Sequence, residues 1–207
     1  MKKGLIVAMT SEYEALRRAG VTGVIKSGIG KADAARAATE FILTEHPDCI
    51  INSGCAGGLA EGVSVYDIVL GSQTAYHDVW CGEGNLRGQV QGLPQRFDAD
   101  PSLLAAARTL PTAHPLHCGL ICTGDQFVST VEEDAKIREL YPDALACDME
   151  SAAIAQVCLH YGVPFLSFRI ISDTRTGDGN RFSDYTDFWD RIADDSFTFI
   201  RELIEKL

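Results

Sequence analysis

Three carboxylates stand shortly after apolar runs of this 207-residue chain, where a folded protein can use them for proton transfer. Glu12 follows the apolar run at residues 4–8, and Asp173 follows the run at residues 165–171. Glu150 separates a third short run from an alanine-rich segment. Carboxyl groups act as general acids or bases, and ionised carboxylates stabilise positive charge that develops beside them. Each position alone also has a structural explanation, because acidic residues favour helix starts and aspartate caps turns.

Three glycine-rich or polar segments occupy similar positions after apolar runs. They are residues 27–31 (SGIGK), 54–58 (GCAGG) and 123–127 (TGDQF). Residues 28–30 lack the third glycine of a dinucleotide-binding fingerprint, so no such cofactor is indicated. Taken singly, the two glycine-rich segments are typical of tight turns. With the three carboxylates they form six polar clusters, and their common placement favours a shared ligand site.

Short apolar runs alternate with segments of helical periodicity along the chain. Strands are expected at residues 4–8, 24–25, 49–51, 67–70, 118–122, 145–147 and 165–171. Helices are expected at residues 12–18, 31–45, 101–109, 131–140, 149–161 and 184–207. This alternation predicts one α/β domain over residues 1–207, a three-layer α/β/α fold with a central, mostly parallel mixed sheet. Residues 76–98 are expected to form a long loop or an irregular hairpin. Ligands of such folds bind at the carboxyl ends of strands, where the six clusters fall.

The composition narrows the possible classes of function. A formal net charge of -11 disfavours nucleic acid as a partner, because binding it needs a basic surface. No run of eighteen apolar residues exists, so no membrane span is expected, and the apolar stretch at residues 4–9 is too short for a signal peptide. The seven cysteines include no C-x-x-C pair and suit free thiols in a reducing cytoplasm. Neither they nor the five histidines show the spacing of metal ligands, so we expect no metal and no cofactor.

In sequence order, six segments resemble the methylthioadenosine/adenosylhomocysteine nucleosidases, a branch of the nucleoside phosphorylase family. They are residues 27–31 (SGIGK), 51–58 (INSGCAGG), 67–69 with 76–78 (DIV, YHD), 123–127 (TGDQF), 148–153 (DMESAA) and 169–173 (RIISD). The resemblance covers nearly the whole chain, and the M-E-x-A-A and I-S-D elements are fairly specific to the superfamily. It implies an N-glycosyl hydrolase that cleaves a small nucleoside such as 5'-methylthioadenosine or S-adenosylhomocysteine to adenine and the thioribose. It also implies a homodimer, because the family places the region of residues 76–97 at a subunit interface.

The resemblance implies catalytic roles for three residues. Asp173 matches the acid that protonates or hydrogen-bonds N7 of the leaving purine, and Ser172 precedes it in the same motif. Glu12 matches the carboxylate that activates the attacking water, and Arg169 matches a residue near that water. Breaking an N-glycosidic bond builds positive charge on the ribose and negative charge on the base, which carboxylates and a proton donor stabilise. Acid and base must lie on opposite sides of the sugar, so they should come from distant parts of the chain, as Glu12 and Asp173 do.

Five further positions match residues that bind the substrate. Glu150 matches the residue that holds the ribose 2' and 3' hydroxyls, and Met149 matches the side chain packed against the sugar. Phe127 matches the ring stacked on the base, and Val128 the residue whose backbone reads the base edge. Cys55 stands where the nucleosidases usually have serine. A thiol is a weaker hydrogen-bond partner, so any contact there with water or sugar is weakened.

Three alternative functions remain open. Phosphorolysis on the same fold needs fixed cations for the phosphate. The phosphorylase branch has arginine near Asn52, which is neutral here, and only Ser27 and Lys31 remain as phosphate-loop candidates, so hydrolysis is favoured. Futalosine hydrolysis is a second alternative, because the N-terminal part is shortened. A nucleoside-binding protein without catalysis is the third, but it would have no need for three carboxylates. Arg175 and Arg181 either recognise an anionic or polar 5' group or lie on a solvated face.

Overall fold

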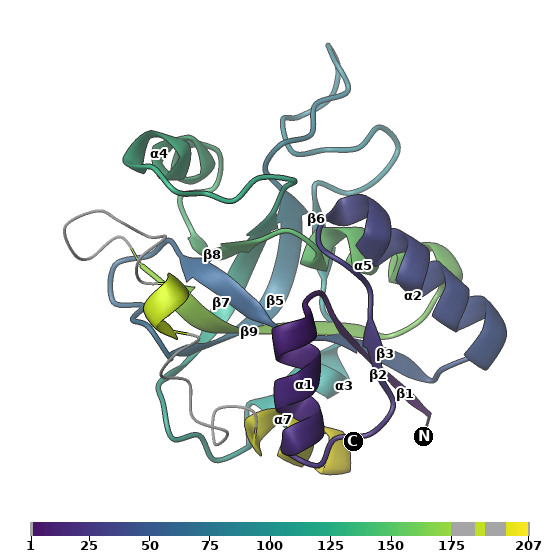
Figure 1. The fold of residues 1–207 in the computed structure, drawn as a ribbon. Helices are drawn as coiled ribbons and strands as arrows, with labels where there is room; N and C mark the ends of the chain where they lie inside the picture. The colour runs from purple at the N-terminus through teal and green to yellow at the C-terminus, as the bar shows by residue number, and fades with distance from the viewer. Residues whose placement is uncertain (1, 175–184, 189–197, 207) are drawn as a thin grey trace.

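A nine-stranded mixed sheet runs through the middle of the molecule in the computed structural model, which describes residues 2–174, 185–188 and 198–206 (Figure 1). The strands are β1 (Lys3–Val7), β2 (Val24–Lys26), β3 (Cys49–Asn52), β4 (Cys55–Gly58), β5 (Ile68–Tyr76), β6 (Arg96–Asp98), β7 (Leu116–Thr123), β8 (Ala144–Asp148) and β9 (Phe165–Asp173). The helices are α1 (Thr10–Arg18), α2 (Lys31–Glu45), α3 (Pro101–Ala107), α4 (Val131–Leu140), α5 (Ser151–Tyr161) and α7 (Thr198–Lys206). The strand order is β2-β1-β3-β9-β4-β8-β7-β5-β6.

Helices cover both faces of the sheet, which confirms the expected α/β/α class. On one face α2 and α5 pack together, with Ala38 and Ile154 buried against Ile6 and Ile50 of the sheet (Figure 1). On the other face α1, α3 and α7 bury Leu16, Leu103 and Leu203 in a second core with residues of β1, β3, β5 and β9. Alanine predominates on the buried faces of α2 and α5, and it lets these two helices approach each other and the sheet closely.

The sheet closes on itself at β9. One edge of β9 pairs with β3 and then with β4, while its other edge pairs antiparallel with β5. Because β4 also pairs with β8, β8 with β7, and β7 with β5, five strands form a closed ring. Its interior holds one buried apolar side chain from each strand, namely Ala56, Val69, Ile121, Ala146 and Ile171. Within this ring β9 runs opposite to β7 and β8, and β4 pairs with both β8 and β9 close to their last residues, where the predicted site residues lie.

Some element boundaries differ from the prediction. Residues 55–58 form strand β4 where a glycine-rich turn was expected, because β8 and β9 pair with it on either side. Helix α5 begins at Ser151 and not at residue 149, which leaves Met149 and Glu150 free of the helix. The segment after β5 is an irregular hairpin, since β6 pairs antiparallel with β5. Helix α4 has the predicted bounds, and a capping box of Thr130 and Glu133 explains its start.

The C-terminal prediction is tested only in part. Residues 185–188 are helical, as expected, and α7 buries Ile200 and Leu203. The remainder of the helix expected at residues 184–207, including Trp189, Ile192 and Ala193, lies outside the described residues. In the part of the chain that the structure describes, the helices are too short or too polar to cross a membrane.

Candidate active site

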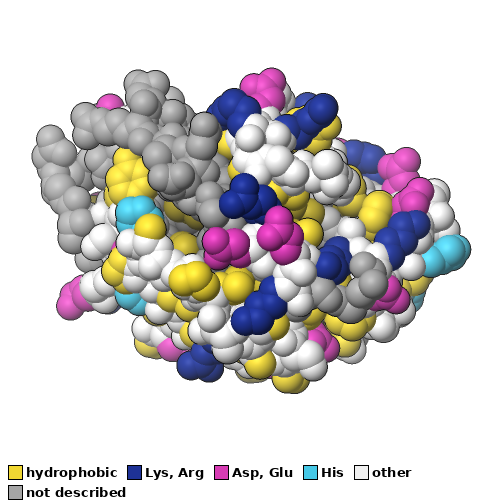
Figure 2. Space-filling model, turned by 90° about the horizontal axis from the view of Figure 1, so that it is seen from below, with side chains coloured by type: hydrophobic (Ala, Val, Ile, Leu, Met, Phe, Trp, Pro, Cys, Tyr) yellow, Lys and Arg dark blue, Asp and Glu magenta, His cyan; other side chains and the backbone are white. Residues whose placement is uncertain are grey.

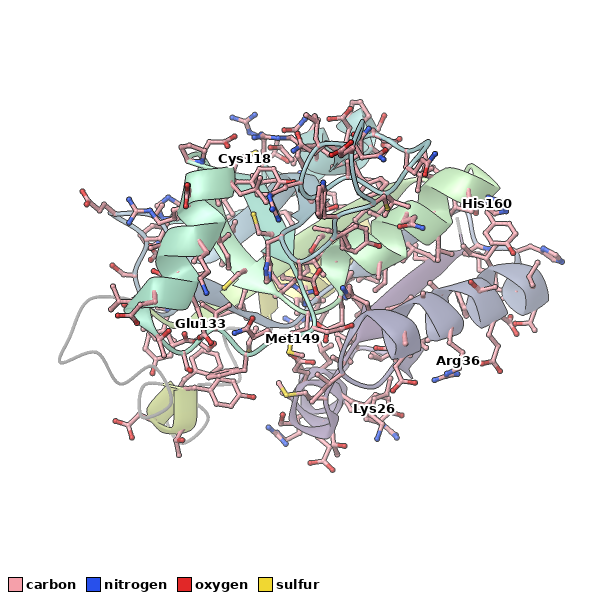
Figure 3. All side chains as sticks on the ribbon, turned by 90° about the horizontal axis from the view of Figure 1, so that it is seen from above. Lys26, Arg36, Cys118, Glu133, Met149 and His160 are labelled. Carbon is pink, nitrogen blue, oxygen red and sulfur yellow. The ribbon has the colours of Figure 1, made fainter. Side chains whose placement is uncertain are left out.

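A pocket of about 120 Å³ opens among the last residues of β8 and β9 and residues that closely follow β1 and β7. Eight of the nine predicted site residues line it, namely Glu12, Cys55, Phe127, Val128, Met149, Glu150, Ser172 and Asp173. In Figure 3 the labelled Met149 lies between Glu133 of α4 and Lys26 of β2. Segments that are far apart in the sequence therefore converge on one cavity, as the six polar clusters predicted.

Glu12 is buried in the first turn of α1, and both of its carboxylate oxygens are held by backbone N–H groups. Oε2 accepts hydrogen bonds from the N–H groups of Ala8 (3.0 Å) and Met9 (2.8 Å), and Oε1 accepts one from Cys55 (2.9 Å). Burial raises the pKa of Glu12, while the N–H groups of Met9 and Cys55 and the charge of Arg169 act in the opposite direction. The result is a rigidly placed carboxylate that is more basic than an exposed one.

Gly54 allows Glu12 and Arg169 to approach the same stretch of backbone. Its φ of +144° lies in the region that favours glycine. A Cβ atom at this position would lie 2.5 Å from Glu12 Oε1 and 2.7 Å from Arg169 Nη1. The glycine-rich sequence around Gly54 therefore serves close contact with the site, in addition to forming part of the sheet through β4.

Glu150 lies between β8 and α5 and contacts the start of α2. Its Oε1 accepts a hydrogen bond from the N–H of Gly30 at 2.9 Å, at the positive end of a 15-residue helix. Its Oε2 lies 3.8 Å from Arg169 Nη2. Burial raises the pKa of Glu150 to about 7, although the Arg169 charge and the Gly30 N–H oppose the change. Glu150 is thus positioned to change its protonation state close to neutral pH.

Arg169 is the exception among the predicted residues, because it lies behind the pocket wall with a side chain only 1% exposed. Its guanidinium contacts Asp148 Oδ2 through Nε at 2.8 Å and Nη2 at 2.6 Å, and Nη2 also donates to Asn52 Oδ1 and to Ser151 Oγ. Burial alone would lower the pKa of Arg169, but the charges of Asp148, Glu150 and Glu12 outweigh it and raise the pKa. One buried cation is therefore shared by three carboxylates.

Asp173 and Ser172 line the pocket at the end of β9. Both are buried, and Ser172 Oγ lies 2.7 Å from Asp173 Oδ1 and 3.3 Å from the carbonyl oxygen of Ala56. A hydroxyl carries one proton and two lone pairs. Ser172 can donate to an ionised Asp173, or donate to Ala56 and accept the proton of a neutral Asp173. This arrangement accommodates both protonation states of a general acid.

Aromatic and sulfur-containing side chains form the remaining walls. The ring of Phe127 is 41% exposed and meets the ring of Tyr185 edge to face, with 5.6 Å between centroids. The hydroxyl of Tyr185 lies 3.1 Å from the sulfur of Met9. Burial raises the pKa of the Cys55 thiol well above its ordinary value, and Glu12 reinforces the effect. A flat apolar base fits between such walls better than a charged group does.

Sequence reasoning missed several lining residues, among them Met9, Asp148, Cys147 and Tyr185. Asp148 had a signal, because it shares the D-M-E segment with two predicted residues. Tyr185 had none, since only the fold brings residues 185–188 to the pocket. Arg175 and Arg181 lie outside the described residues, so the role suggested for them stays a prediction. Among the residues described, no cluster of three potential metal ligands occurs.

The pocket wall is acidic in the part of the chain that the structure describes, residues 2–174, 185–188 and 198–206. Four carboxylates line it, and no Lys, Arg or His side chain of these residues does. The four carboxylates are Glu12, Asp148, Glu150 and Asp173. Lys31, a phosphate-loop candidate, lies 2.6 Å from Asp78. On the face of the molecule seen in Figure 2, Lys and Arg side chains are interspersed with Asp and Glu. The described pocket therefore suits a neutral or positively charged ligand better than an anion.

Comparisons with known proteins place the chain in a family. A family model described as the phosphorylase superfamily matches residues 5–205. The 5'-methylthioadenosine/S-adenosylhomocysteine nucleosidase of Haemophilus influenzae (strain PittGG) is 33% identical over 231 aligned positions, which cover 100% of both chains. The protein of the same name from Actinobacillus succinogenes is 38% identical over 187 positions, covering 89% of this chain and 80% of that relative.

Solved structures extend the similarity to the fold. The nucleosidase of Neisseria meningitidis in complex with methylthio-immucillin-A has a TM-score of 0.90 and 35% identity, and the match covers 100% of both chains. A putative nucleosidase of Borrelia burgdorferi bound to adenine has a TM-score of 0.91 and 32% identity, covering 99% of this chain and 100% of that one. The chain therefore belongs to the phosphorylase superfamily, in its branch of 5'-methylthioadenosine/S-adenosylhomocysteine nucleosidases.

Proposed function

We propose that this chain hydrolyses the N-glycosidic bond of 5'-methylthioadenosine or S-adenosylhomocysteine and releases adenine and the corresponding thioribose. One observation carries the proposal: the carboxylates of Glu12 and Asp173 are both buried and both line one pocket, although they stand at opposite ends of the chain. The close relatives named as nucleosidases, one bound to adenine, support the same substrate class.

Asp173 is the proposed general acid. As the glycosidic bond breaks, negative charge develops on the purine, and a proton delivered to N7 stabilises the departing base. The hydroxyl of Ser172, 2.7 Å from Asp173 Oδ1, orients the carboxyl group before and after the proton leaves. Phe127 and Val128 line the same pocket and are the proposed contacts of the base, through ring stacking and through the backbone.

Glu12 is the proposed general base for the attacking water. Three backbone N–H groups fix its carboxylate, and its raised pKa strengthens it as a proton acceptor.

The proposed sugar contacts are Glu150 and Met149. Glu150 binds the 2' and 3' hydroxyls and stabilises the positive charge that develops on the ribose, and Met149 packs against the sugar. Arg169 acts from behind the wall, by holding Asp148 and lying 3.8 Å from Glu150. Cys55 borders the proposed water site through its N–H contact to Glu12.

Hydrolysis is favoured over phosphorolysis by the charge of the pocket. A phosphate dianion needs fixed cations, but the pocket wall within the described part of the chain carries carboxylates and no Lys or Arg. The ammonium of Lys31 is engaged by Asp78 at 2.6 Å and lies 3.7 Å from Asp125. The hydroxyl of Ser27 lies 2.8 Å from the carbonyl oxygen of Gly28 and 3.2 Å from that of Val7. Both phosphate-loop candidates are thus occupied by other contacts.

We further propose that the protein is a cytoplasmic homodimer. Trp80 and Leu86 are 52% and 59% exposed on the irregular segment between β5 and β6, which suits an apolar contact with a second copy. All seven cysteines are free thiols, as is usual in a reducing compartment.

The decisive experiment is incubation of the purified protein with a panel of purine nucleosides, with and without inorganic phosphate and with a metal chelator in a parallel arm. The expected products are adenine and a free 5-thio-substituted ribose, at rates that neither phosphate nor the chelator changes. A sugar 1-phosphate as the main product would replace the hydrolase by a phosphorylase. Turnover of futalosine in preference to methylthioadenosine would keep the reaction but change the substrate.

A further inference from the structure

The ammonium group of Lys31 joins three segments at the edge of the pocket. Its Nζ lies 2.6 Å from Asp78 Oδ2 and 3.7 Å from Asp125 Oδ2, and it sits over the ring of Tyr76 at 5.6 Å from the centroid. Lys31 begins α2, Asp78 follows β5, and Asp125 follows β7. We call these three residues the Lys31–Asp78–Asp125 cluster.

Backbone hydrogen bonds close the same cluster into a ring. The N–H of Lys31 donates to Asp125 Oδ1 at 2.7 Å, and the N–H of Asp125 donates to Asp78 Oδ2 at 2.9 Å. A Cβ atom on Gly30, whose φ is +94°, would lie only 2.9 Å from Asp125 Oδ1, so glycine is needed for this approach. Burial alone would raise the pKa of Asp78, but the Lys31 ammonium and the Asp125 N–H outweigh it and lower the pKa.

The cluster connects the two walls that face the proposed sugar and base. On one side Gly30, next to Lys31, donates its N–H to Glu150 at 2.9 Å. On the other side Phe127, which lines the pocket, is two residues beyond Asp125. Phe127 is 41% exposed, so burial contributes little to fixing its position. Polar contacts between Asp125 and Lys31 therefore link the Phe127 segment to the turn that holds Glu150, in addition to the hydrogen bond from the Gly124 N–H to the Asp148 carbonyl oxygen at 3.1 Å.

We propose that the Lys31–Asp78–Asp125 cluster is a positioning device that fixes the base-binding Phe127 segment relative to the sugar-binding Glu150. The identity of the ligand in this statement rests on the function proposed above. Lys31, Asp78 and Asp125 touch no reacting atom in this scheme. They affect binding of the nucleoside because they hold the Phe127 segment and Glu150 at a fixed separation.

Removal of the Lys31 ammonium should have a specific effect on the cluster. Without the ammonium group, the carboxylates of Asp78 and Asp125 remain close together and repel each other. The repulsion pushes the Asp125 segment, and Phe127 with it, away from the turn at Gly30. Neutralising Asp78 removes the repulsion and leaves an amide oxygen that still accepts the Asp125 N–H. A second substitution should therefore repair the first, which simple loss of packing would not allow.

Three variants test the proposal, with 5'-methylthioadenosine as substrate. Lys31→Met should raise KM about three- to tenfold and change kcat less than about twofold, given the worth of partly exposed ion pairs. Lys31→Met/Asp78→Asn should recover at least half of the lost affinity. Added NaCl should lower the KM of Lys31→Met by screening the repulsion. The control is Lys2→Met, which removes an ammonium 2.6 Å from Glu45 on the exposed surface and should leave KM unchanged.

A second readout needs no catalysis. Amide hydrogen exchange of residues 124–130, followed by mass spectrometry, should be faster in Lys31→Met than in wild type and slower again in the double variant. Unchanged exchange in Lys31→Met, or faster exchange with an unchanged KM, would overturn the proposal. If the wild-type protein cleaves no nucleoside, the proposed function fails, while the exchange data still decide whether the cluster holds this segment.

Discussion

Arg169 and Asp148 form an ion pair in which two guanidinium nitrogens, Nε at 2.8 Å and Nη2 at 2.6 Å, contact the same carboxylate oxygen. Both side chains are only 1% exposed, and each has further polar partners. The Asp148 carboxylate also accepts hydrogen bonds from Thr123 Oγ1 at 2.5 Å and from the N–H of Ser151, at the start of α5. The pair therefore ties β7, β8, β9 and α5 together, with Asp148 in the pocket wall and Arg169 behind it.

Replacing Asp148 by asparagine should destabilise the protein by about 3 kcal/mol, because a buried guanidinium loses its closest negative partner. Arg169 then becomes more available to Glu150, and the charge of Asp148 no longer raises the pKa of Glu150. The acid limb of the rate–pH profile should consequently move to lower pH. Urea unfolding and a pH profile of kcat/KM measure the two effects.

The matched control is Asp143→Asn. Asp143 pairs with Arg96 through two contacts of 2.6 and 2.8 Å, but its side chain is 59% exposed. An exposed pair contributes less than about 1 kcal/mol. Equal losses of stability in Asp148→Asn and Asp143→Asn would contradict the claim that the buried Arg169–Asp148 pair stabilises the fold more than an exposed pair.

Glu150→Gln should stabilise the folded protein at neutral pH while lowering its activity. The pKa of Glu150 is about 7 in the folded state, against an ordinary value of 4.5. Between these two values the folded state binds more protons than the unfolded state, so the wild type loses stability as the pH rises through this window. The gain from the substitution should therefore grow from about pH 4.5 to about pH 7 and then stay level, at about 3 kcal/mol.

Urea unfolding of wild type and Glu150→Gln at pH 5, 6, 7 and 8 measures this difference. Both proteins contain the other titrating groups, so the difference isolates Glu150. A difference that is constant across the four pH values would show that Glu150 ionises in the folded state as it does in the unfolded chain.

Cys55 should be unreactive although it lines the pocket, because burial keeps its thiol protonated. Iodoacetamide at neutral pH should first label Cys81 and Cys118, which are exposed, and leave the activity intact. Cys55→Ser should change the rate less than about threefold, since the contact with Glu12 uses the backbone N–H. Mass spectrometry of the labelled sites, with a parallel assay, checks the order. Early labelling of Cys55 with loss of activity would contradict it.

The proposed dimer depends on the exposed side chains between β5 and β6. Trp80→Asp with Leu86→Asp should convert the protein to a monomer, because charged groups would have to be buried in the contact. Multi-angle light scattering of both proteins at the same concentration measures the mass. Leu43→Asp, at a 55% exposed position on α2, is the control and should remain a dimer. A monomeric wild type would remove the basis of the proposal.

The sequence predicted two features correctly, namely the bounds of α4 and the convergence of the site residues on one pocket. Thr130 and Glu133 mark the start of α4 through their reciprocal capping contacts, and this signal is local. The convergence of Glu12 and Asp173 follows from a general property of parallel sheets, since β1, β3 and β9 are parallel and their carboxyl ends lie at one edge. Glu150 follows β8, which runs opposite to β9, so its place in the pocket depends on the mixed pairing of β4 with both strands. The start of α4 and the convergence of Glu12 with Asp173 required no knowledge of the ring of strands.

Features that depend on strand neighbours could not be predicted. Residues 55–58 have low intrinsic β propensity, and only pairing with β8 and β9 makes them a strand. The antiparallel pairing of β5 with β9, which closes the ring, joins segments about 100 residues apart. The same limit applies to Lys31, whose role depends on two carboxylates that lie 47 and 94 positions away in the sequence.

The most direct test of the proposed mechanism is the kcat of Asp173→Asn with 5'-methylthioadenosine. Asparagine keeps the shape of the side chain and the neighbouring Ser172, but it cannot deliver a proton to the purine. We predict that kcat falls about a hundred- to ten-thousand-fold while KM changes little, as expected for the loss of a general acid. A nucleoside whose base leaves without protonation should be much less affected. If Asp173 only capped a turn, the variant would lose about 1 kcal/mol of stability and keep its turnover. A kcat close to that of the wild type would contradict the assignment of Asp173 as the acid and, with it, the proposed mechanism of the site.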